Sequence, residues 1–371
     1  MNNYINFFTL IEVMINIIGG GPVGSYLAYL LSKAGKKVEV YEEHTKIGVP
    51  LQCTGLVTSS INEVISLRKQ FVVNKINKIK VFFPNKKSII FELKKPNFVL
   101  DRVKFDQYLA ERAKSLGVEY NLGHRFVGID KGDLIFDCNG RTIKKEKGVI
   151  IGADGPLSHV AKATNLYKKR SFVSALQARI SLNVDPNTVE VWLGEGLFGW
   201  VVPENSNIVR IGIAVKEHPN EHFREFLNKR APKAKVRDYC SGLIPIYNPS
   251  IKTVGRNVFL VGDAATQVKA TSYGGIVPGL LAAQELGKAI IKKKSYEKLW
   301  KKKIGKDLKY SLLIRKVLNR FSPKDYNSLF YLITPKVKKL IEKHDREFPS
   351  KLVIKLIFAQ PRFLKFIFKF L

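Results

Sequence analysis

The chain has 371 residues, of which 45% are hydrophobic and 11% aromatic, a composition that allows a sizeable core and excludes a disordered protein. At this length we expect two closely joined domains rather than one. Basic residues outnumber acidic residues by 63 to 31, and the formal net charge of +32 favours anionic partners, either nucleic acid or a membrane surface.

The basic residues are scattered from Lys33 to Lys369, so a lysine-rich, solvated surface is the alternative explanation of the charge. No Arg-rich, RNP-type or zinc-finger pattern occurs, and nucleic acid is therefore not the expected partner. The three cysteines, Cys53, Cys138 and Cys240, lack CxxC spacing. This arrangement predicts a reduced, cytosolic protein without a metal site.

Residues 1–13 have neither a basic start nor a small-residue cleavage site, so they make a poor signal peptide. Because Met14 directly precedes the first predicted strand, we hypothesise that the native chain starts there. Mass spectrometry of the native N-terminus tests this, and a peptide covering residues 1–13 would contradict it.

The stretch 14–42 predicts a strand, a glycine turn, a helix and a second strand around Gly19-x-Gly21-x-x-Gly24. Gly19 allows the tight turn, Gly21 lets a pyrophosphate approach the backbone, and Gly24 allows close packing of helix and strand. Glu42 ends the second strand, where a carboxylate accepts hydrogen bonds from ribose hydroxyls and repels a 2′-phosphate. The stretch therefore predicts a site for FAD or NAD rather than NADP.

The next segments alternate between a loop, a hairpin and a helix. Residues 43–60 form a loop rich in Gly, Thr and Ser, in which a single cysteine, Cys53, is by its spacing alone more often inert than chemical. Residues 72–83 and 88–93 predict a hairpin, and 101–117 predict a helix. Arg102 stands at the start of that helix, where the helix dipole opposes a cation, so we expect either a phosphate contact or a surface arginine.

A buried-type strand at 149–151 leads into Gly152-Ala153-Asp154-Gly155. Strand-like runs at 172–182, 188–193, 199–202 and 208–215 then predict an antiparallel sheet separate from the first unit. Within it Phe198 and Trp200 share one face of a strand, either as plain core or as the wall of an apolar pocket.

Residues 257–261 predict another buried strand, which runs into Gly262-Asp263. Gly274-Gly275 then opens an apolar helix that starts at Ile276 and extends to residue 291. This repeats the architecture of 14–42, because the positive end of a helix again follows a glycine turn.

Beyond residue 292 the chain is predicted to be helical and basic. In the final segment, 350–371, Lys351 and Lys355 share one helix face, and Arg362, Lys365 and Lys369 share another after a proline. Charges interrupt every apolar run well before the ~18 residues that a spanning helix needs, so the segment is expected to lie in a membrane interface. The alternative is an amphipathic helix docked on its own protein.

The three glycine-centred motifs at 19–28, 152–158 and 261–268 occur in an order and spacing that resembles the FAD-dependent oxidoreductases of the para-hydroxybenzoate hydroxylase type. Within that class the chain is similar to the geranylgeranyl reductase family, especially archaeal digeranylgeranylglycerophospholipid reductases. The similarity is carried by the cysteine loop PLQCTGLV at 50–57, by LDRVKFDQYLA at 100–110, by FGWVVP at 198–203 and by GDAATQVKATSYGGI at 262–276.

The resemblance implies an α/β fold with a Rossmann-like FAD-binding domain, an inserted antiparallel β-sheet substrate domain and a helical, basic C-terminal region. The implied FAD-binding domain comprises 1–70, 97–170 and 250–295, the substrate domain 71–96 and 171–249, and the C-terminal region 296–371. The implied cofactor-binding residues are Gly19, Gly21, Pro22, Val23, Gly24, Glu42, Cys53, Arg102, Asp154, Gly155, Gly262, Asp263, Gly274, Gly275 and Ile276. The implied catalytic residues are Cys53, Phe198, Trp200 and Tyr273.

The resemblance also implies saturation of the carbon–carbon double bonds of geranylgeranyl chains in archaeal membrane lipid precursors, by flavin hydride transfer with protonation. It leaves the electron donor open among NADPH, NADH and reduced ferredoxin, and it leaves the role of Cys53 open. We expect a monomer on the inner face of the cell membrane, bound to an isoprenoid lipid substrate and to anionic lipids. The alternatives are an FAD-dependent monooxygenase or epoxidase on an apolar substrate, and a basic nucleic-acid-binding protein with a vestigial nucleotide fold.

Overall fold

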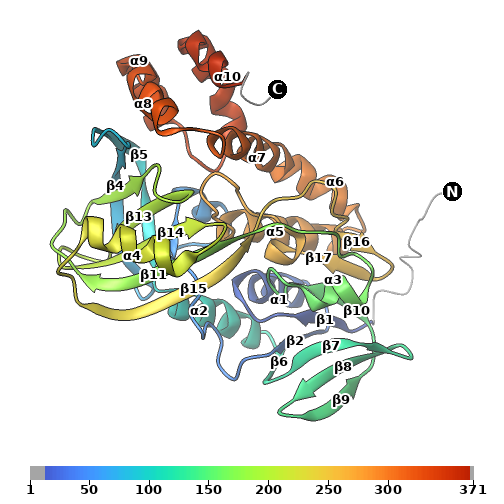
Figure 1. Cartoon of the computed structure of the whole chain (residues 1–371). Coiled ribbons are helices and arrows are strands. Elements are labelled where there is room, and N and C mark those ends of the chain that lie inside the picture. The colour runs from blue at the N-terminus through green and yellow to red at the C-terminus, as the bar shows by residue number, and fades with distance from the viewer. Residues whose placement is uncertain (1–12, 368–371) are drawn as a thin grey trace.

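The computed structural model describes residues 13–367 (Figure 1). The hypothesis that the native chain starts at Met14 concerns a segment of which only residue 13 is described, and Lys369 also lies outside the described residues. Two large sheets lie side by side, and the helices of the C-terminal region cover one end of the molecule, drawn at the top of Figure 1.

The first sheet has six strands in the order β16-β17-β10-β1-β2-β6. All neighbours are parallel except β16 and β17. The strands are β1 (Ile15–Ile18), β2 (Val38–Glu42), β6 (Glu119–Leu122), β10 (Val149–Gly152), β16 (Val254–Gly255) and β17 (Val258–Leu260). Every residue of β1 is buried, because the sheet has layers on both faces, and this explains why three of its four residues are isoleucine.

Helices cover one face of this sheet, and a small sheet covers the other. The helices α1 (Pro22–Lys33), α2 (Arg102–Lys114) and α5 (Ile276–Ile291) pack together and bury a shared apolar core with β1 and β2. The small sheet comprises β7 (Arg125–Asp130), β8 (Asp133–Cys138) and β9 (Arg141–Lys145), and α3 (His159–Ala163) packs beside it. The ring of Tyr41 in β2 stacks on Phe136 in β8 at 4.3 Å between centroids, which joins the two sheets.

The sequence analysis did not predict the small sheet. Its turns carry recognisable signals, because Lys131-Gly132 and Asn139-Gly140 all have positive φ, as the tight turns of hairpins require. Asn139-Gly140 in particular is a typical hairpin signal.

The second sheet has eight strands in the order β15-β11-β14-β13-β12-β4-β5-β3. They are β3 (Leu56–Val57), β4 (Val72–Phe82), β5 (Ser88–Leu100), β11 (Phe172–Ser181), β12 (Thr188–Trp192), β13 (Phe198–Pro203), β14 (Ile208–Val215) and β15 (Val236–Pro245). The helix α4 (Pro219–Arg230) packs on one face of it.

The prediction of an antiparallel sheet is wrong at one position, because β12 pairs with β4 in parallel. The two strands come from distant parts of the chain, so no hairpin turn fixes their relative direction. Strand β5 also extends to Leu100 and β3 joins it from the loop that follows Cys53, so the sheet reaches beyond the segments assigned to it by sequence. The domain boundaries themselves remain a prediction.

The C-terminal region is helical, as the sequence indicates. It comprises α6 (Tyr296–Trp300), a π-helical turn (Lys301–Gly305), α7 (Lys306–Leu318), α8 (Pro323–Leu332), α9 (Pro335–Lys343), α10 (Pro349–Ala359) and α11 (Leu364–Ile367). Helix α9 lies against β5, and α10 packs on α7 and α9. Within residues 13–367, no helix combines the length and hydrophobicity that crossing a bilayer would need. The α/β fold with a helical C-terminal region is therefore confirmed.

Candidate active site

A single cavity of about 740 Å³ lies between the two sheets and reaches the C-terminal helices. Of the predicted site residues, only Gly24 and Gly262 do not line it. The fold thus brings together segments that are separated by more than two hundred residues in the chain, from the α1 turn to the start of α5.

The glycine turn before α1 has the shape that a dinucleotide needs. A Cβ atom on Gly21 would meet no heavy atom within 4 Å, and this residue faces the cavity, so the turn leaves free space beside the helix N-terminus. A Cβ atom on Gly24 would lie 2.0 Å from the carbonyl oxygen of Gly19, so that position allows close packing instead. Free space next to the backbone amides at a helix N-terminus fits a pyrophosphate.

Glu42 lies at the end of β2 and is held by backbone groups. Its Oε2 accepts a hydrogen bond from the Gly20 amide at 2.7 Å, and its Oε1 accepts one from the His44 amide at 3.0 Å. Nδ1 of His44 also lies 2.6 Å from Oε1. These contacts fix the carboxylate in the cavity wall, and Oε2 keeps a lone pair for the ribose contact expected there.

Arg102 begins α2 and forms a bidentate pair with Asp106, with Nε–Oδ1 at 3.0 Å and Nη2–Oδ2 at 2.8 Å. Burial by itself lowers the pKa of Arg102, but the carboxylate of Asp106 and the nearby thiol of Cys53 raise that pKa above its ordinary value. The guanidinium group is therefore permanently charged in the cavity wall. Whether it contacts a phosphate stays a prediction.

Asp154 lines the cavity and also makes hydrogen bonds that hold the local fold. Its Oδ1 accepts a hydrogen bond from Ser158 Oγ at 2.7 Å, and its Oδ2 accepts one from the Val160 amide at 2.9 Å. These contacts hold Asp154 against the first turn of α3. Burial raises the pKa of its carboxyl group, and the two hydrogen bonds oppose that shift. Gly155, next to it, has a φ of 73° and also lines the cavity.

Asp263 lies against the start of α5. A Cβ atom on Gly275 would lie 2.7 Å from Asp263 Oδ1, so Gly275 leaves the room that this carboxylate occupies. Desolvation raises the pKa of Asp263 to about 6, and the charge of Arg102 opposes that shift. Gly274 and Ile276 line the cavity beside it, so the N-terminus of α5 faces the cavity.

The second sheet supplies the apolar half of the cavity. The rings of Phe198 and Trp200 lie 5.8 Å apart, and the ring of Tyr273 lies nearly parallel to Phe198 at 5.8 Å. Trp200 pairs with Gly212 of β14, where a Cβ atom would be only 2.3 Å from the indole ring. The wall is completed by small and apolar side chains, namely Ala175, Val189, Val191, Val202, Ala214 and Ile244.

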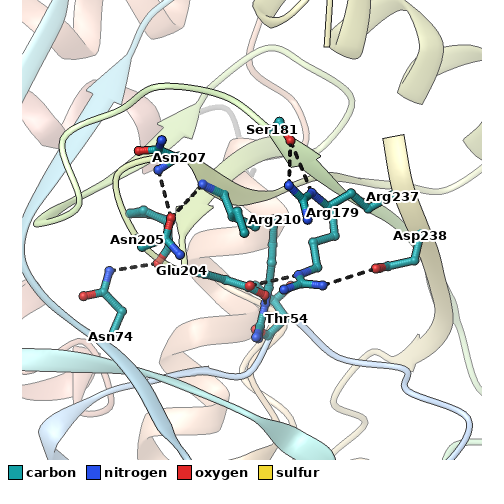
Figure 2. Close-up of polar contacts among 12 residues, drawn as sticks. Thr54, Asn74, Arg179, Ser181, Glu204, Asn205, Asn207, Arg210, Arg237 and Asp238 are labelled. Atoms are coloured by element: carbon teal, nitrogen blue, oxygen red, sulfur yellow. Dashed lines mark hydrogen bonds and ion pairs between the residues drawn. The ribbon is translucent and has the colours of Figure 1, made fainter. Parts of the chain in front are cut away.

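The loop that contains Cys53 is fixed to this sheet by a buried polar network (Figure 2). Arg210 donates to the carbonyl oxygens of Thr54 and Leu100, the latter at 2.9 Å. Its charge is balanced by Glu204, with Nε–Oε1 at 2.7 Å, and Arg179 binds the other oxygen of the same carboxylate at 2.8 Å. The sequence analysis missed this network, although a charged residue within the buried strand 208–215 was a signal for it.

A second bridge joins the cysteine loop to the aromatic wall. Oε1 of Gln177 accepts hydrogen bonds from Thr54 Oγ1 at 2.6 Å and from Trp200 Nε1 at 3.1 Å. Sγ of Cys53 accepts a hydrogen bond from the Gly55 amide at 3.3 Å and lines the cavity. Cys53 and Trp200 are therefore held relative to each other through one amide oxygen.

The C-terminal helices close the cavity with residues that sequence reasoning did not identify. Arg315 of α7 donates to the Ala270 carbonyl at 3.0 Å, and its guanidinium group lies 5.1 Å from the ring centroid of Tyr273. Lys269, Arg346 and Glu347 also line the cavity. No periodicity in the sequence reports such contacts, because they depend on how the C-terminal region folds back over the sheets.

The fold is that of flavin-type oxidoreductases with a Rossmann-like dinucleotide-binding domain. Residues 17–54 match the model of the NAD(P)-binding Rossmann-like domain family. A flavin-dependent brominase of known structure superposes with a TM-score of 0.71 at 14% identity, over 89% of this chain and 92% of the brominase. At that identity the likeness shows the shared fold.

Two further proteins are similar along nearly the whole chain. The digeranylgeranylglycerophospholipid reductase of Methanocaldococcus jannaschii is 28% identical, over 94% of this chain and 96% of its own. The crystal structure of a geranylgeranyl bacteriochlorophyll reductase-like protein from Thermoplasma acidophilum gives a TM-score of 0.81 at 21% identity, over 93% and 96% of the two chains. The chain is therefore a homologue of the digeranylgeranylglycerophospholipid reductases, and the resemblance to geranylgeranyl reductases is confirmed.

Proposed function

We propose that this protein is an FAD-dependent reductase that saturates carbon–carbon double bonds of geranylgeranyl chains in archaeal membrane lipid precursors. One observation carries the proposal: a single cavity joins the dinucleotide-binding turn of α1 to an apolar pocket lined by aromatic side chains. The reductases and reductase-like proteins to which the chain is similar support the same reaction class.

The cofactor, when bound, supplies a hydride to the substrate. The residues of the chain have other tasks, of which the first is to exclude water with the apolar wall of β11–β14. The faces of Phe198 and Trp200 offer electron density next to an alkene that gains positive character as it is protonated. Both Cys53 and Tyr273 line the cavity and carry a transferable proton, although the hydroxyl group of Tyr273 is itself sealed from solvent.

The two candidate proton donors differ in their surroundings. Burial raises the pKa of Tyr273, and its hydroxyl group has no hydrogen-bond partner among the described residues. Cys53 lies on the loop held by Arg210 and Gln177. We expect Cys53→Ser to lower turnover if the thiol delivers the proton, with Tyr273→Phe as the matched test of the phenol. Full turnover of Cys53→Ser on lipid substrate would remove Cys53 from the mechanism.

The reaction class is tested by mass spectrometry of lipids from a host that makes the unsaturated diether, with and without this protein. Saturated chains that also form under anaerobic conditions support reduction, whereas oxygenated products that require oxygen would show a monooxygenase or epoxidase. NADPH, NADH and reduced ferredoxin are compared as donors by the bleaching of the bound flavin. A colourless purified protein that retains RNA in a salt-dependent way would contradict the flavoenzyme altogether.

We further propose that the C-terminal helices bind an anionic membrane surface on the cytoplasmic side. Phe358 is 81% exposed and Ile354 47% exposed on α10, and α11 begins with the exposed Leu364. Exposed cations surround these apolar side chains, namely Lys351, Lys355, Arg362 and Lys365. Apolar groups beside cations match an anionic lipid interface, where burial and Coulomb attraction act together.

The structure shows how to test this without damaging the fold. Truncation at Pro349 would remove the buried Ser350, whose amide donates to Asp307 at 3.0 Å, so a point variant is cleaner. We expect Phe358→Asp to weaken flotation with anionic liposomes, and salt to weaken it further. Tyr239→Asp, on β15 and 65% exposed, serves as a control outside the C-terminal helices and should leave flotation unchanged. Unchanged flotation of Phe358→Asp would refute membrane binding through α10.

A further inference from the structure

The α9–α10 loop places an arginine in the cavity wall without an acceptor for its hydrogen bonds. Arg346 lines the cavity, and its Nε is sealed from solvent with no hydrogen-bond partner. Among residues 13–367 the structure records no hydrogen bond or ion pair for the rest of the guanidinium group. Arg346 as a whole is half-buried, so the cost of leaving a donor without an acceptor falls on the sealed Nε, while the terminal nitrogens stay accessible to a ligand.

The carboxylates next to Arg346 in sequence are engaged elsewhere. Asp345 Oδ2 accepts a hydrogen bond from Ser60 Oγ at 2.7 Å. Glu347 Oε1 accepts from Lys269 Nζ and from Thr58 Oγ1, the latter at 3.2 Å. Burial lowers the pKa of Arg346, although both carboxylates oppose that shift. The guanidinium group thus lies beside the cavity without an acceptor among the described residues.

Arg346 adjoins two apolar features that suit a lipid, namely the exposed side chains of α10 and the apolar wall of the cavity. Helix α10, labelled in Figure 1, begins at Pro349 immediately after this loop. It exposes Ile354 and Phe358. The apolar wall of the second sheet lines the same cavity as Arg346. Arg315, which also lines it, gives its hydrogen bonds to backbone carbonyls and has no carboxylate partner within the described part of the chain. A ligand with an apolar chain and an anionic end would satisfy both features.

We propose that Arg346 binds the phosphate of an isoprenoid phosphate substrate while the isoprenoid chain lies along the aromatic wall. This inference rests on the proposed function. A planar guanidinium fork binds phosphate oxygens through two parallel N–H···O bonds, and such charge-assisted bonds are stronger than neutral ones. The phosphate belongs either to a free isoprenoid diphosphate or to a glycerolipid headgroup, and both present the same oxygens to the arginine.

The test compares charged and uncharged ligands on the flavin-loaded full chain. Binding is followed by the change in flavin absorbance on titration with geranylgeranyl diphosphate, with digeranylgeranylglyceryl phosphate, and with geranylgeraniol as the uncharged probe. We expect the wild type to prefer a phosphate ligand over the alcohol by about tenfold or more. Arg346→Gln should lose most of that preference, and Arg346→Lys should keep part of it. The control Lys339→Gln removes an exposed charge from α9 and should keep all of it.

The outcomes separate this inference from the proposed function. Loss of preference for the diphosphate alone identifies the free diphosphate as the source of the phosphate, and loss for the glycerolipid alone identifies the headgroup. An unchanged preference in Arg346→Gln overturns the inference while the proposed function stands. A shift in flavin reduction potential without a change in phosphate preference also overturns it, because Arg346 would then face the cofactor. If the wild type binds neither phosphates nor the alcohol, the proposed function fails and the inference falls with it.

Discussion

Replacing Gly212 with alanine should displace the aromatic wall of the cavity. A Cβ atom at this position would lie 2.3 Å from Trp200 Cζ2 and 2.9 Å from the carbonyl oxygen of Leu176. Carbon atoms pack at about 3.5 Å, so the indole ring would have to retreat by roughly 1.2 Å. Its Nε1–Oε1 hydrogen bond to Gln177, now 3.1 Å, would then be stretched beyond a useful length.

The free energy follows from these two effects. Overpacking of a filled site costs about 1–3 kcal/mol, and the lost hydrogen bond about 1 kcal/mol more. We therefore expect Gly212→Ala to lower the free energy of unfolding by about 2–4 kcal/mol in denaturant titrations, and to shift the Trp200 fluorescence. Turnover should fall more than flavin content, because Trp200, which the new Cβ atom displaces, lines the apolar half of the cavity.

Gly128 is the matched control. It also lies in a strand, β7, and a Cβ atom there would meet no heavy atom within 4 Å. Gly128→Ala should leave stability, fluorescence and turnover close to those of the wild type. The reasoning would be refuted if Gly212→Ala were as stable as Gly128→Ala and left the tryptophan fluorescence unchanged.

Three further predictions concern the cofactor end and the cysteine loop. Gly21→Val should abolish flavin binding while the cofactor-free protein keeps its melting temperature, because the new side chain enters open space. Gly24→Val should instead prevent folding, because its Cβ atom would lie 2.0 Å from the carbonyl oxygen of Gly19. Glu204→Gln leaves the buried guanidinium group of Arg210 without its counterion, while Arg179 keeps Asp238 at 3.7 Å, so we expect a loss of about 3–5 kcal/mol in unfolding titrations and faster alkylation of Cys53 as its loop loosens. Desolvation raises the pKa of Asp263 to about 6, above its ordinary value of about 3.9. The folded protein thus holds this proton more tightly, so its contribution is complete below about pH 4 and is lost as the pH rises through 6, and Asp263→Asn should remove about 3 kcal/mol of that decline in the cofactor-free protein.

Some residues of the candidate site could be predicted from the sequence, and others could not. The glycine turn and Glu42 could be placed because strand, turn, helix and acid follow one another within a single local unit. Trp200 and Phe198 could be assigned to one strand face because side chains alternate along a strand. Gln177, which joins Trp200 to the cysteine loop, could not be found in this way, since no local pattern distinguishes it from other polar strand residues.

The sequence by itself determined the class of ligand and the local geometry that receives it. The spacing of Gly19, Gly21 and Gly24 is a property of neighbouring residues, and it already predicts a dinucleotide turn. Only the tertiary structure decided which residues surround the reacting half of the cavity. The C-terminal region folds back over both sheets and brings Arg315 and Arg346 to it, and such long-range contacts depend on the path of the whole chain rather than on any local period.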